Sequence, residues 1–90
     1  MSQYVATYDI GDDRQREKIA RVLLRYGERL QKSVFIVELE PEDIRDLQFA
    51  IGRHLSADDE FDVIPVDASP HRVHLRWQAN IDDLAPVIVV

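Results

Sequence analysis

Residues 3–27 read QYVATYDIGDDRQREKIARVLLRYG, and this stretch decides the fold. Its first part, residues 3–8, is rich in β-branched and aromatic residues and predicts a buried strand that ends at Asp9. Asp12 lies after a break and is a suitable N-cap, because its side chain can accept a backbone N–H of the first helical turn. Residues 13–26 repeat apolar side chains at a period of 3.6, which predicts an amphipathic helix.

The rest of the chain continues the alternation of strands and helices. Gly27 suits the end of the first helix, and residues 29–40 form a second β-region, which we expect a bulge near Lys32 and Ser33 to split into two strands. Pro41 suits the first turn of a second helix. The apolar face of that helix comprises Ile44, Leu47, Ile51 and Leu55. Further strands are predicted at residues 61–66, 72–77 and 86–90.

This order of elements is βαββαβ followed by additional C-terminal β-structure. It predicts an α+β fold of the ferredoxin-like type, in a single domain spanning residues 1–90. In that fold an antiparallel sheet carries both helices on one face, which leaves the other face uncovered. A chain of 90 residues buries only about two-thirds of its unfolded surface. We therefore expect a homodimer in which a second copy packs on the uncovered face.

The composition excludes several classes of protein. There is no cysteine, so disulfides and thiolate metal sites are excluded. No stretch approaches the roughly 20 apolar residues of a membrane-spanning helix, and the acidic first twenty residues do not resemble a secretory signal peptide. We therefore expect a cytoplasmic protein. We also expect the chain to be ordered nearly from end to end, because 46% of its residues are hydrophobic and no tract is compositionally biased.

The charge is unevenly distributed along the chain. The net charge of -6 argues at first against a nucleic-acid partner, since phosphate binding depends on Lys and Arg. Residues 14–32, however, hold seven basic residues against two acidic ones, a net charge of +5, whereas the remainder holds four against fifteen, a net charge of -11. This asymmetry predicts a basic surface on an otherwise acidic body.

Asp9 is the strongest candidate for chemistry. One aspartate is too little for a metal site, but two copies near the axis of a twofold dimer could supply a pair of carboxylates to one Mg²⁺. Such an ion could lower the pKa of a bound water and neutralise a phosphate oxygen during phosphodiester cleavage. The alternative is an aspartate that caps a turn or pairs with an arginine. Asp12 and Asp13 leave a similar choice between metal ligands and helix caps.

A basic edge runs along the first predicted helix, beside its apolar face. Counting 100° per residue places Lys18, Arg21 and Arg25 within about 40° of Arg14. Acidic partners are scarce in this segment. The edge is therefore either a track for phosphates or a solvated helix face.

Other candidate groups give weaker signals. His71 and His74 lie three residues apart at the predicted strand 72–77, and such a separation points strand residues to opposite faces, which argues against a metal pair. Phe35 and Trp77 lie in apolar segments, which favours core or interface positions over base stacking.

Several short motifs follow one another between residues 4 and 40. They are Tyr8-Asp9-Ile10, Asp12-Asp13-Arg14, Arg16, Leu24, Tyr26-Gly27-Glu28-Arg29-Leu30-Gln31, Ser33-Val34-Phe35 and Glu38-Leu39. In order and spacing they resemble the opening of CRISPR-associated proteins of the Cas2 family. The later part of the chain resembles the family more loosely, through Ile64-Pro65-Val66 and the valine-rich end.

The resemblance implies a ferredoxin-like homodimer that acts as a metal-dependent endonuclease. Asp9 from both subunits would bind Mg²⁺, or Mn²⁺, and would be the catalytic carboxylate in cleavage of single-stranded RNA or, in some members, double-stranded DNA. We expect nucleic-acid contacts from Arg14, Arg16, Lys18, Arg21 and Arg25, and support of the cleft or the dimer interface from Arg29, Ser33 and Phe35.

The resemblance also implies a partner, because the family acts with the CRISPR integrase, Cas1, in the acquisition of new spacers. Two alternatives stay open beside a nuclease that serves this adaptation step. One is a non-catalytic dimeric scaffold that holds DNA in the integrase complex. The other is a ferredoxin-like regulatory module that binds a small ligand, for which the sequence has no positive motif. The acidic net charge departs from many members, which weakens the case for nonspecific duplex binding. Residues 67–84 also depart from many members, which obscures the integrase contact.

Overall fold

The computed structural model describes the backbone of residues 2–66, 74–79 and 87–89 and the side chains of the first two of these ranges. The elements are β1 (Ser2–Asp9), α1 (Asp13–Leu23), β2 (Gly27–Gln31), β3 (Val34–Leu39), α2 (Pro41–Gly52), β4 (Glu60–Pro65), β5 (His74–Trp77) and β6 (Val87–Val89). The predicted α+β class is confirmed. No helix among the described residues is long and apolar enough to cross a membrane.

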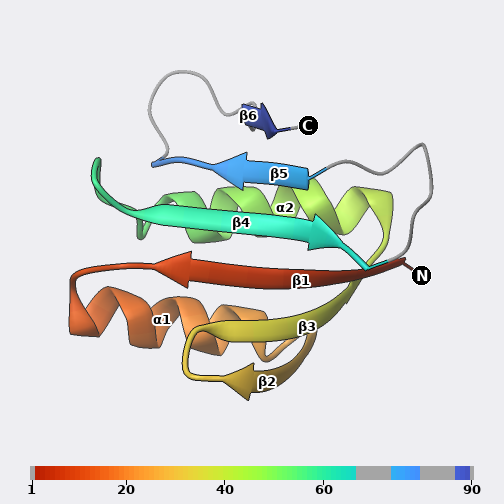
Figure 1. Cartoon of the computed structure of the whole chain (residues 1–90), viewed down its shortest axis with the longest axis horizontal. Helices are drawn as coiled ribbons and strands as arrows, with labels where there is room; N and C mark the ends of the chain where they lie inside the picture. The colour runs from red at the N-terminus through yellow and green to blue at the C-terminus, as the bar shows by residue number, and fades with distance from the viewer. Residues whose placement is uncertain (1, 67–73, 80–86, 90) are drawn as a thin grey trace.

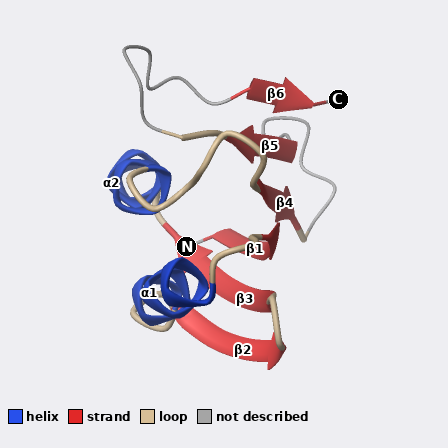
Figure 2. Cartoon of the chain, turned by 90° about the vertical axis from the view of Figure 1, so that its left-hand side faces the viewer, coloured by secondary structure: helices blue, strands red, loops and turns tan. Residues whose placement is uncertain are grey.

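One antiparallel sheet holds all six described strands, in the order β2-β3-β1-β4-β5-β6. The predicted ferredoxin-like order accounts for the first four strands, and the expected extra C-terminal strands extend the sheet beyond β4 (Figure 1). Both helices lie on the same side of the sheet, as Figure 2 shows. The central strand β1 pairs with β3 on one side and with β4 on the other.

The core lies between this sheet and the two helices. In β1 the buried residues alternate with more exposed ones, so Tyr4, Ala6 and Tyr8 face the helices. Four aromatic rings form a row across the sheet within this core. Successive ring centroids lie 6.2 Å apart for Phe35 and Tyr8, 5.8 Å for Tyr8 and Phe61, and 5.5 Å for Phe61 and Trp77. Phe35 and Trp77 are thus core residues, as their apolar context predicted.

Each helix begins with the cap that its sequence provides. The Asp12 side chain accepts the Gln15 backbone N–H at 3.0 Å, which confirms Asp12 as the N-cap of α1. At the start of α2, Pro41 occupies the first turn and the Asp43 carboxylate accepts the Glu40 backbone N–H at 2.9 Å.

The first helix ends earlier than we predicted. It stops at Leu23, and the backbone N–H groups of Arg25 and Tyr26 close a turn there. The carbonyl of Tyr26 accepts the Glu38 N–H at 3.0 Å, so the chain already joins β3 at this point. Gly27 is therefore the first residue of β2 and not a helix cap.

The predicted bulge between the second and third strands was also misplaced. Lys32 and Ser33 form the two-residue turn that connects β2 with β3. The irregularity of the pairing lies earlier, between Arg29 and Gln31.

Gly27 is required because β2 approaches β3 closely. A Cβ atom at this position would lie 1.9 Å from the Ile36 carbonyl oxygen and 2.7 Å from the Val37 Cα. We therefore predict that Gly27→Ala lowers the free energy of unfolding by at least about 2 kcal/mol, because backbone atoms would have to separate. Gly11→Ala is the matched control, since its Cβ would meet nothing within 4 Å. Chemical denaturation of both variants measures the difference, and equal stability would contradict this account.

Candidate functional site

A cavity of about 500 Å³ opens at the end of β1, between the start of α1 and the turn that joins β2 to β3. Its lining comprises Tyr8, Asp9, Ile10, Asp13, Arg16, Glu17, Arg29, Lys32 and Ser33. Of the residues that the sequence singled out, the cavity thus brings together Asp9, Asp13, Arg16, Arg29 and Ser33. Three acidic and three basic side chains surround it, so it suits a polar, charged ligand.

Asp9 occupies the end of β1 with its side chain exposed. The alternation of β1 places it on the side of the strand that the helices do not cover, and the pairing with β4 sets it opposite Glu60. Among residues 2–66, 74–79 and 87–89, the Asp9 carboxylate has no hydrogen-bond or ion-pair partner. The alternative interpretation, in which Asp9 caps a turn or pairs with an arginine, therefore has no support among these residues.

Arg16 holds the chain that follows Asp9. Its guanidinium donates to the Ile10 carbonyl at 2.7 Å and to the Gly11 carbonyl at 3.5 Å, and it forms an ion pair with Asp13. We expected Arg16 to contact nucleic acid, and Asp13 to be either a metal ligand or a helix cap. In this structure both side chains are engaged with each other, and Arg16 fixes the turn beside the cavity.

Arg29 and Phe35 form one unit at the wall of the cavity. Phe35 is fully buried in the core, and the Arg29 guanidinium lies 5.0 Å from the centre of its ring. This cation–π contact orients Arg29 while leaving its N–H groups exposed. The Ser33 carbonyl accepts the Tyr8 N–H at 3.2 Å, which ties the β2–β3 turn to the end of β1.

Lys32 is one of the lining residues that the sequence analysis did not predict as a site residue. It lies in the β2–β3 turn, is exposed, and has no ion-pair partner in the described part of the chain. The signal was present in the sequence, because Lys32 belongs to the basic segment 14–32. The sequence could not show that Lys32 lies near Asp9, because this proximity depends on the pairing of β1 with β3.

The basic edge of α1 lies outside the cavity lining. Arg14, Lys18, Arg21 and Arg25 are all exposed. Arg25 lies in the turn after α1 and not on the helix, as we had predicted, because the helix already ends at Leu23. Within the described ranges none of the four has a salt bridge. The structure therefore separates two basic features, the cavity cations and the helix edge.

Comparison with known proteins now identifies the family. The profile described as CRISPR associated protein Cas2 matches residues 1–72. The chain belongs to the Cas2 family. A protein of Synechocystis sp. named CRISPR-associated endoribonuclease Cas2 is 48% identical over 48 residues, which cover 53% of this chain and 52% of that relative. A protein of Thermus thermophilus named CRISPR-associated endonuclease Cas2 is 41% identical over 64 residues, 70% of this chain and 71% of the relative.

Two solved structures share the fold with this Cas2-family chain. A hypothetical protein from Thermus thermophilus is 36% identical, with a TM-score of 0.71 over 80% of this chain and 89% of the other. The Cas2 structure of Streptococcus pyogenes at pH 6.5 is 20% identical, with a TM-score of 0.68 over 72% of this chain and 86% of the other. The alignment with the Synechocystis relative spans about half of that protein's length.

The donor set of the cavity suits a hard cation only in part. Mg²⁺ and Mn²⁺ prefer oxygen ligands, and the exposed carboxylate of Asp9 is such a ligand. No group of three or more His, Asp or Glu side chains that could hold a metal occurs among the described residues. A complete site in this Cas2-family chain therefore needs further ligands from water, from phosphate or from a second copy.

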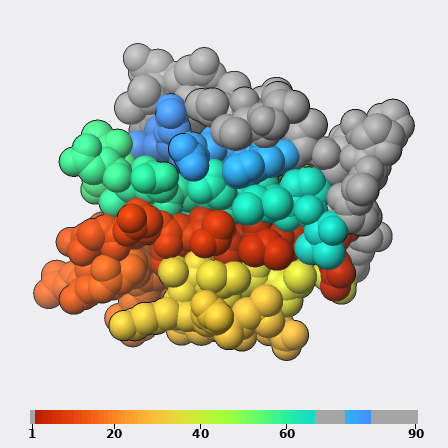
Figure 3. Space-filling model, viewed as in Figure 1, coloured from red at the N-terminus to blue at the C-terminus, as the bar shows by residue number. Residues whose placement is uncertain are grey.

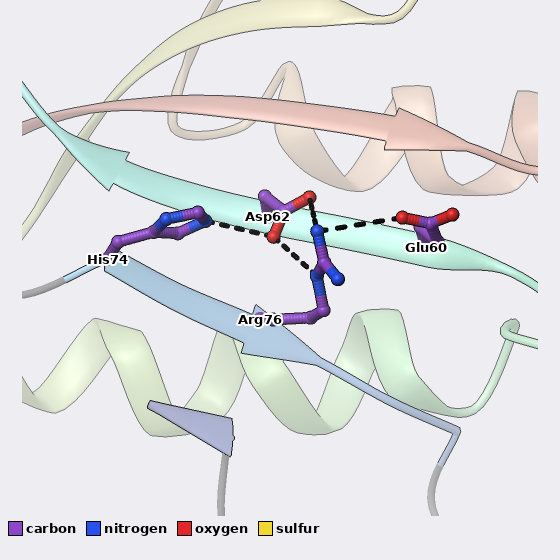
Figure 4. Close-up of polar contacts among 4 residues, drawn as sticks. All are labelled: Glu60, Asp62, His74 and Arg76. Atoms are coloured by element: carbon purple, nitrogen blue, oxygen red, sulfur yellow. Dashed lines mark hydrogen bonds and ion pairs between the residues drawn. The ribbon is translucent and has the colours of Figure 1, made fainter. Parts of the chain in front are cut away.

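A second polar cluster lies on the uncovered face of the sheet (Figure 4). The Asp62 carboxylate lies 2.9 Å from the His74 Nε2 and accepts the Arg76 Nε–H at 2.9 Å. Arg76 also lies 3.6 Å from a Glu60 carboxylate oxygen. Burial raises the pKa of Asp62, but the hydrogen bonds from Arg76 and His74 outweigh that effect and leave the pKa below its usual value of 3.8.

Because the pKa of Asp62 is lowered, the stability of the fold should depend on pH through this group. A carboxyl group with a depressed pKa in the folded state stabilises the fold above its unfolded pKa, and the contribution disappears as pH falls through the folded pKa. We expect Asp62→Asn to lower the thermal midpoint at pH 7, and the gap from wild type to close below about pH 4. Asp46→Asn, an exposed carboxylate on α2, is the control. A gap that persists unchanged at pH 2 would contradict this assignment.

Proposed function

We propose that this Cas2-family chain is a metal-dependent endonuclease of CRISPR adaptation that cleaves single-stranded RNA and acts with the integrase Cas1. The unpartnered carboxylate of Asp9, in one cavity with the cations Arg29 and Lys32, carries the proposal. The names of the relatives support it, since they are called endoribonuclease or endonuclease. Duplex DNA is the second substrate class to test, because the backbone phosphates are the same in charge.

Each cavity residue has a defined part in this proposal. Asp9 would hold Mg²⁺ or Mn²⁺. When bound, the ion would lower the pKa of the attacking water and neutralise charge that develops on the phosphate. Arg29 and Lys32 would bind and orient the phosphate through charge-assisted hydrogen bonds. Arg16 would keep the turn after Asp9 in place through the Ile10 carbonyl.

A second copy would complete the site. The uncovered face of the sheet, visible in Figure 3, carries a row of apolar side chains formed by Ile36, Val5 and Ile64. Val5 and Ile36 are half-buried, and Ile64 is 37% exposed. Asp9 lies on the same side of β1 as Val5. A homodimer formed through this face would cover the row and bring two Asp9 residues to one interface.

The scaffold function is the second candidate, and a separate observation favours it. The exposed basic edge of α1 lies outside the cavity and has no acidic partner in the described part of the chain. It suits the backbone of a nucleic acid that is held and not cut. In that role the protein would hold DNA for the integrase, and Asp9 would not be needed.

The first test separates these functions. We predict that Asp9→Ala lowers the rate of Mg²⁺-dependent cleavage of labelled single-stranded RNA at least about 100-fold, since loss of residues that only orient metal ligands already costs 10–100-fold. The circular dichroism spectrum should not change, because Asp9 is exposed. Asp46→Asn is the control for loss of a carboxylate. Full activity of a pure Asp9→Ala protein would refute the site.

The same preparations test the scaffold. Reversal of charge at Arg14, Lys18, Arg21 and Arg25 should weaken binding of duplex DNA more than tenfold, and each lost phosphate contact should lower the salt dependence of log Kd by about 0.9. Asp9→Ala should bind duplex as wild type does. The scaffold function replaces the nuclease if neither wild type nor Asp9→Ala cleaves RNA or DNA at any pH or with any metal tested, while reversal of the helix charges weakens duplex binding.

The dimer makes a further prediction. Val5→Glu places a charge in the middle of the apolar row, where burial in an interface would be costly. Sedimentation equilibrium should show a monomer for Val5→Glu and a dimer for wild type. Leu24→Glu is the control, because Leu24 is 51% exposed at the end of α1, away from that face. A stable Val5→Glu dimer would exclude this face as the interface.

A further inference from the structure

Asp59 connects the α2–β4 loop to the turn that follows Asp9. One of its carboxylate oxygens accepts the Gly11 backbone N–H at 3.3 Å, and the other accepts the Ser56 N–H at 2.7 Å. Gly11 and Asp59 are 48 residues apart in the sequence. We propose that Asp59 is a positioning residue for Asp9, an inference that rests on the proposed function of Asp9.

The turn after Asp9 is held from two directions. Asp59 accepts the Gly11 N–H, and on the other side the Arg16 guanidinium donates to the carbonyls of Ile10 and Gly11. The ladder between β1 and β4 ends with Asp9 opposite Glu60. Beyond that pair no strand pairing fixes the chain, so these side-chain contacts take over where the ladder stops.

The loop that carries Asp59 is itself anchored. The Asp59 N–H donates to the Ser56 carbonyl at 3.0 Å, which closes a turn that its own carboxylate completes through the Ser56 N–H. Just before this turn, the His54 Nδ1 lies 2.9 Å from the Gln15 side-chain oxygen of α1. The end of α2 is thereby tied to the helix that begins beside the cavity. Asp59 thus reaches Gly11 from a fixed position.

The bond to Gly11 contributes more to geometry than to stability. Gly11 is exposed, so its N–H would donate to water if Asp59 were removed. The expected loss of stability is therefore small. The position of Asp9, two residues earlier, would become less defined, and residues that orient metal ligands in this way typically contribute 10–100-fold to metal affinity or activity.

The experiment compares Asp59→Ala and Asp59→Asn with Asp58→Asn. Asp58 is exposed in the same loop, and its carboxylate has no partner among the residues that the structure describes. For cleavage of labelled single-stranded RNA with Mg²⁺, we expect Asp59→Ala to lower kcat about 10–100-fold while KM stays within about twofold. Asp59→Asn keeps one acceptor and should lie between Asp59→Ala and wild type. Asp58→Asn should behave as wild type.

Two further readouts do not depend on activity. In nuclear magnetic resonance spectra, Asp59→Ala should speed hydrogen exchange of the Gly11 amide more than about tenfold and shift the Asp9 carboxyl carbon. Asp58→Asn should change neither. If the wild type cleaves nothing, the proposed function fails, but these two signals still decide whether Asp59 positions Asp9.

Three results would overturn the inference. They are a wild-type kcat for Asp59→Ala, an unchanged Gly11 amide and Asp9 carboxyl resonance, and a loss of kcat and of thermal midpoint that Asp58→Asn reproduces. If Asp59→Ala does not fold, Asp59→Asn is judged by the same criteria, because it keeps the size of the side chain.

Discussion

The row of stacked rings formed by Phe35, Tyr8, Phe61 and Trp77 is the interaction on which the arrangement of this sheet depends. The rings come from β3, β1, β4 and β5, so their stacking links four strands of the sheet. Tyr8, Phe61 and Trp77 are register partners, whereas Phe35 lies diagonally to Tyr8 because it pairs with Ala6. Stacked aromatic pairs contribute beyond their buried area and are sensitive to offset. A slip of one residue in any of these strands would turn a ring out of the core. The position of Asp9, next to Tyr8, is therefore a consequence of packing on the opposite face.

The same alternation sorts charge between the two faces. Directly after the buried Tyr8 and beside the buried Phe61 stand Asp9 and Glu60, on the side that no helix covers. Further along that face Asp62 and Arg76 satisfy each other, so the sheet centre combines apolar side chains with an internally paired polar cluster. The basic residues of segment 14–32 lie instead on α1, in the turn that follows it, on β2 and in the β2–β3 turn. An overall charge of -6 is thus compatible with local recognition of phosphate.

The sequence predicted those features that depend on local pattern. The period of residues 13–26, the N-cap at Asp12 and the alternation in β1 led to the correct order of elements. The apolar faces of both helices were predicted correctly except at their ends, because Tyr26 and Leu55 lie beyond Leu23 and Gly52, where the helices stop. The prediction for Gly27 was wrong, because a glycine is required there by the close approach of the Ile36 carbonyl in another strand. Local propensity carries no information about such a contact. The contact of Asp59 with Gly11 was invisible for the same reason. Loops that close over 48 residues leave no periodic signal.

Arg16 and Lys32 illustrate why charge alone does not assign a site residue. Both are basic residues of one segment and both line the cavity. Arg16 is committed to carbonyl groups and to Asp13, whereas Lys32, like Asp9, is unpaired among the described residues. Asp9 and Lys32 therefore share a cavity without neutralising each other. A phosphate with its divalent cation carries both complementary charges, and it would supply each of these side chains with the partner that it lacks.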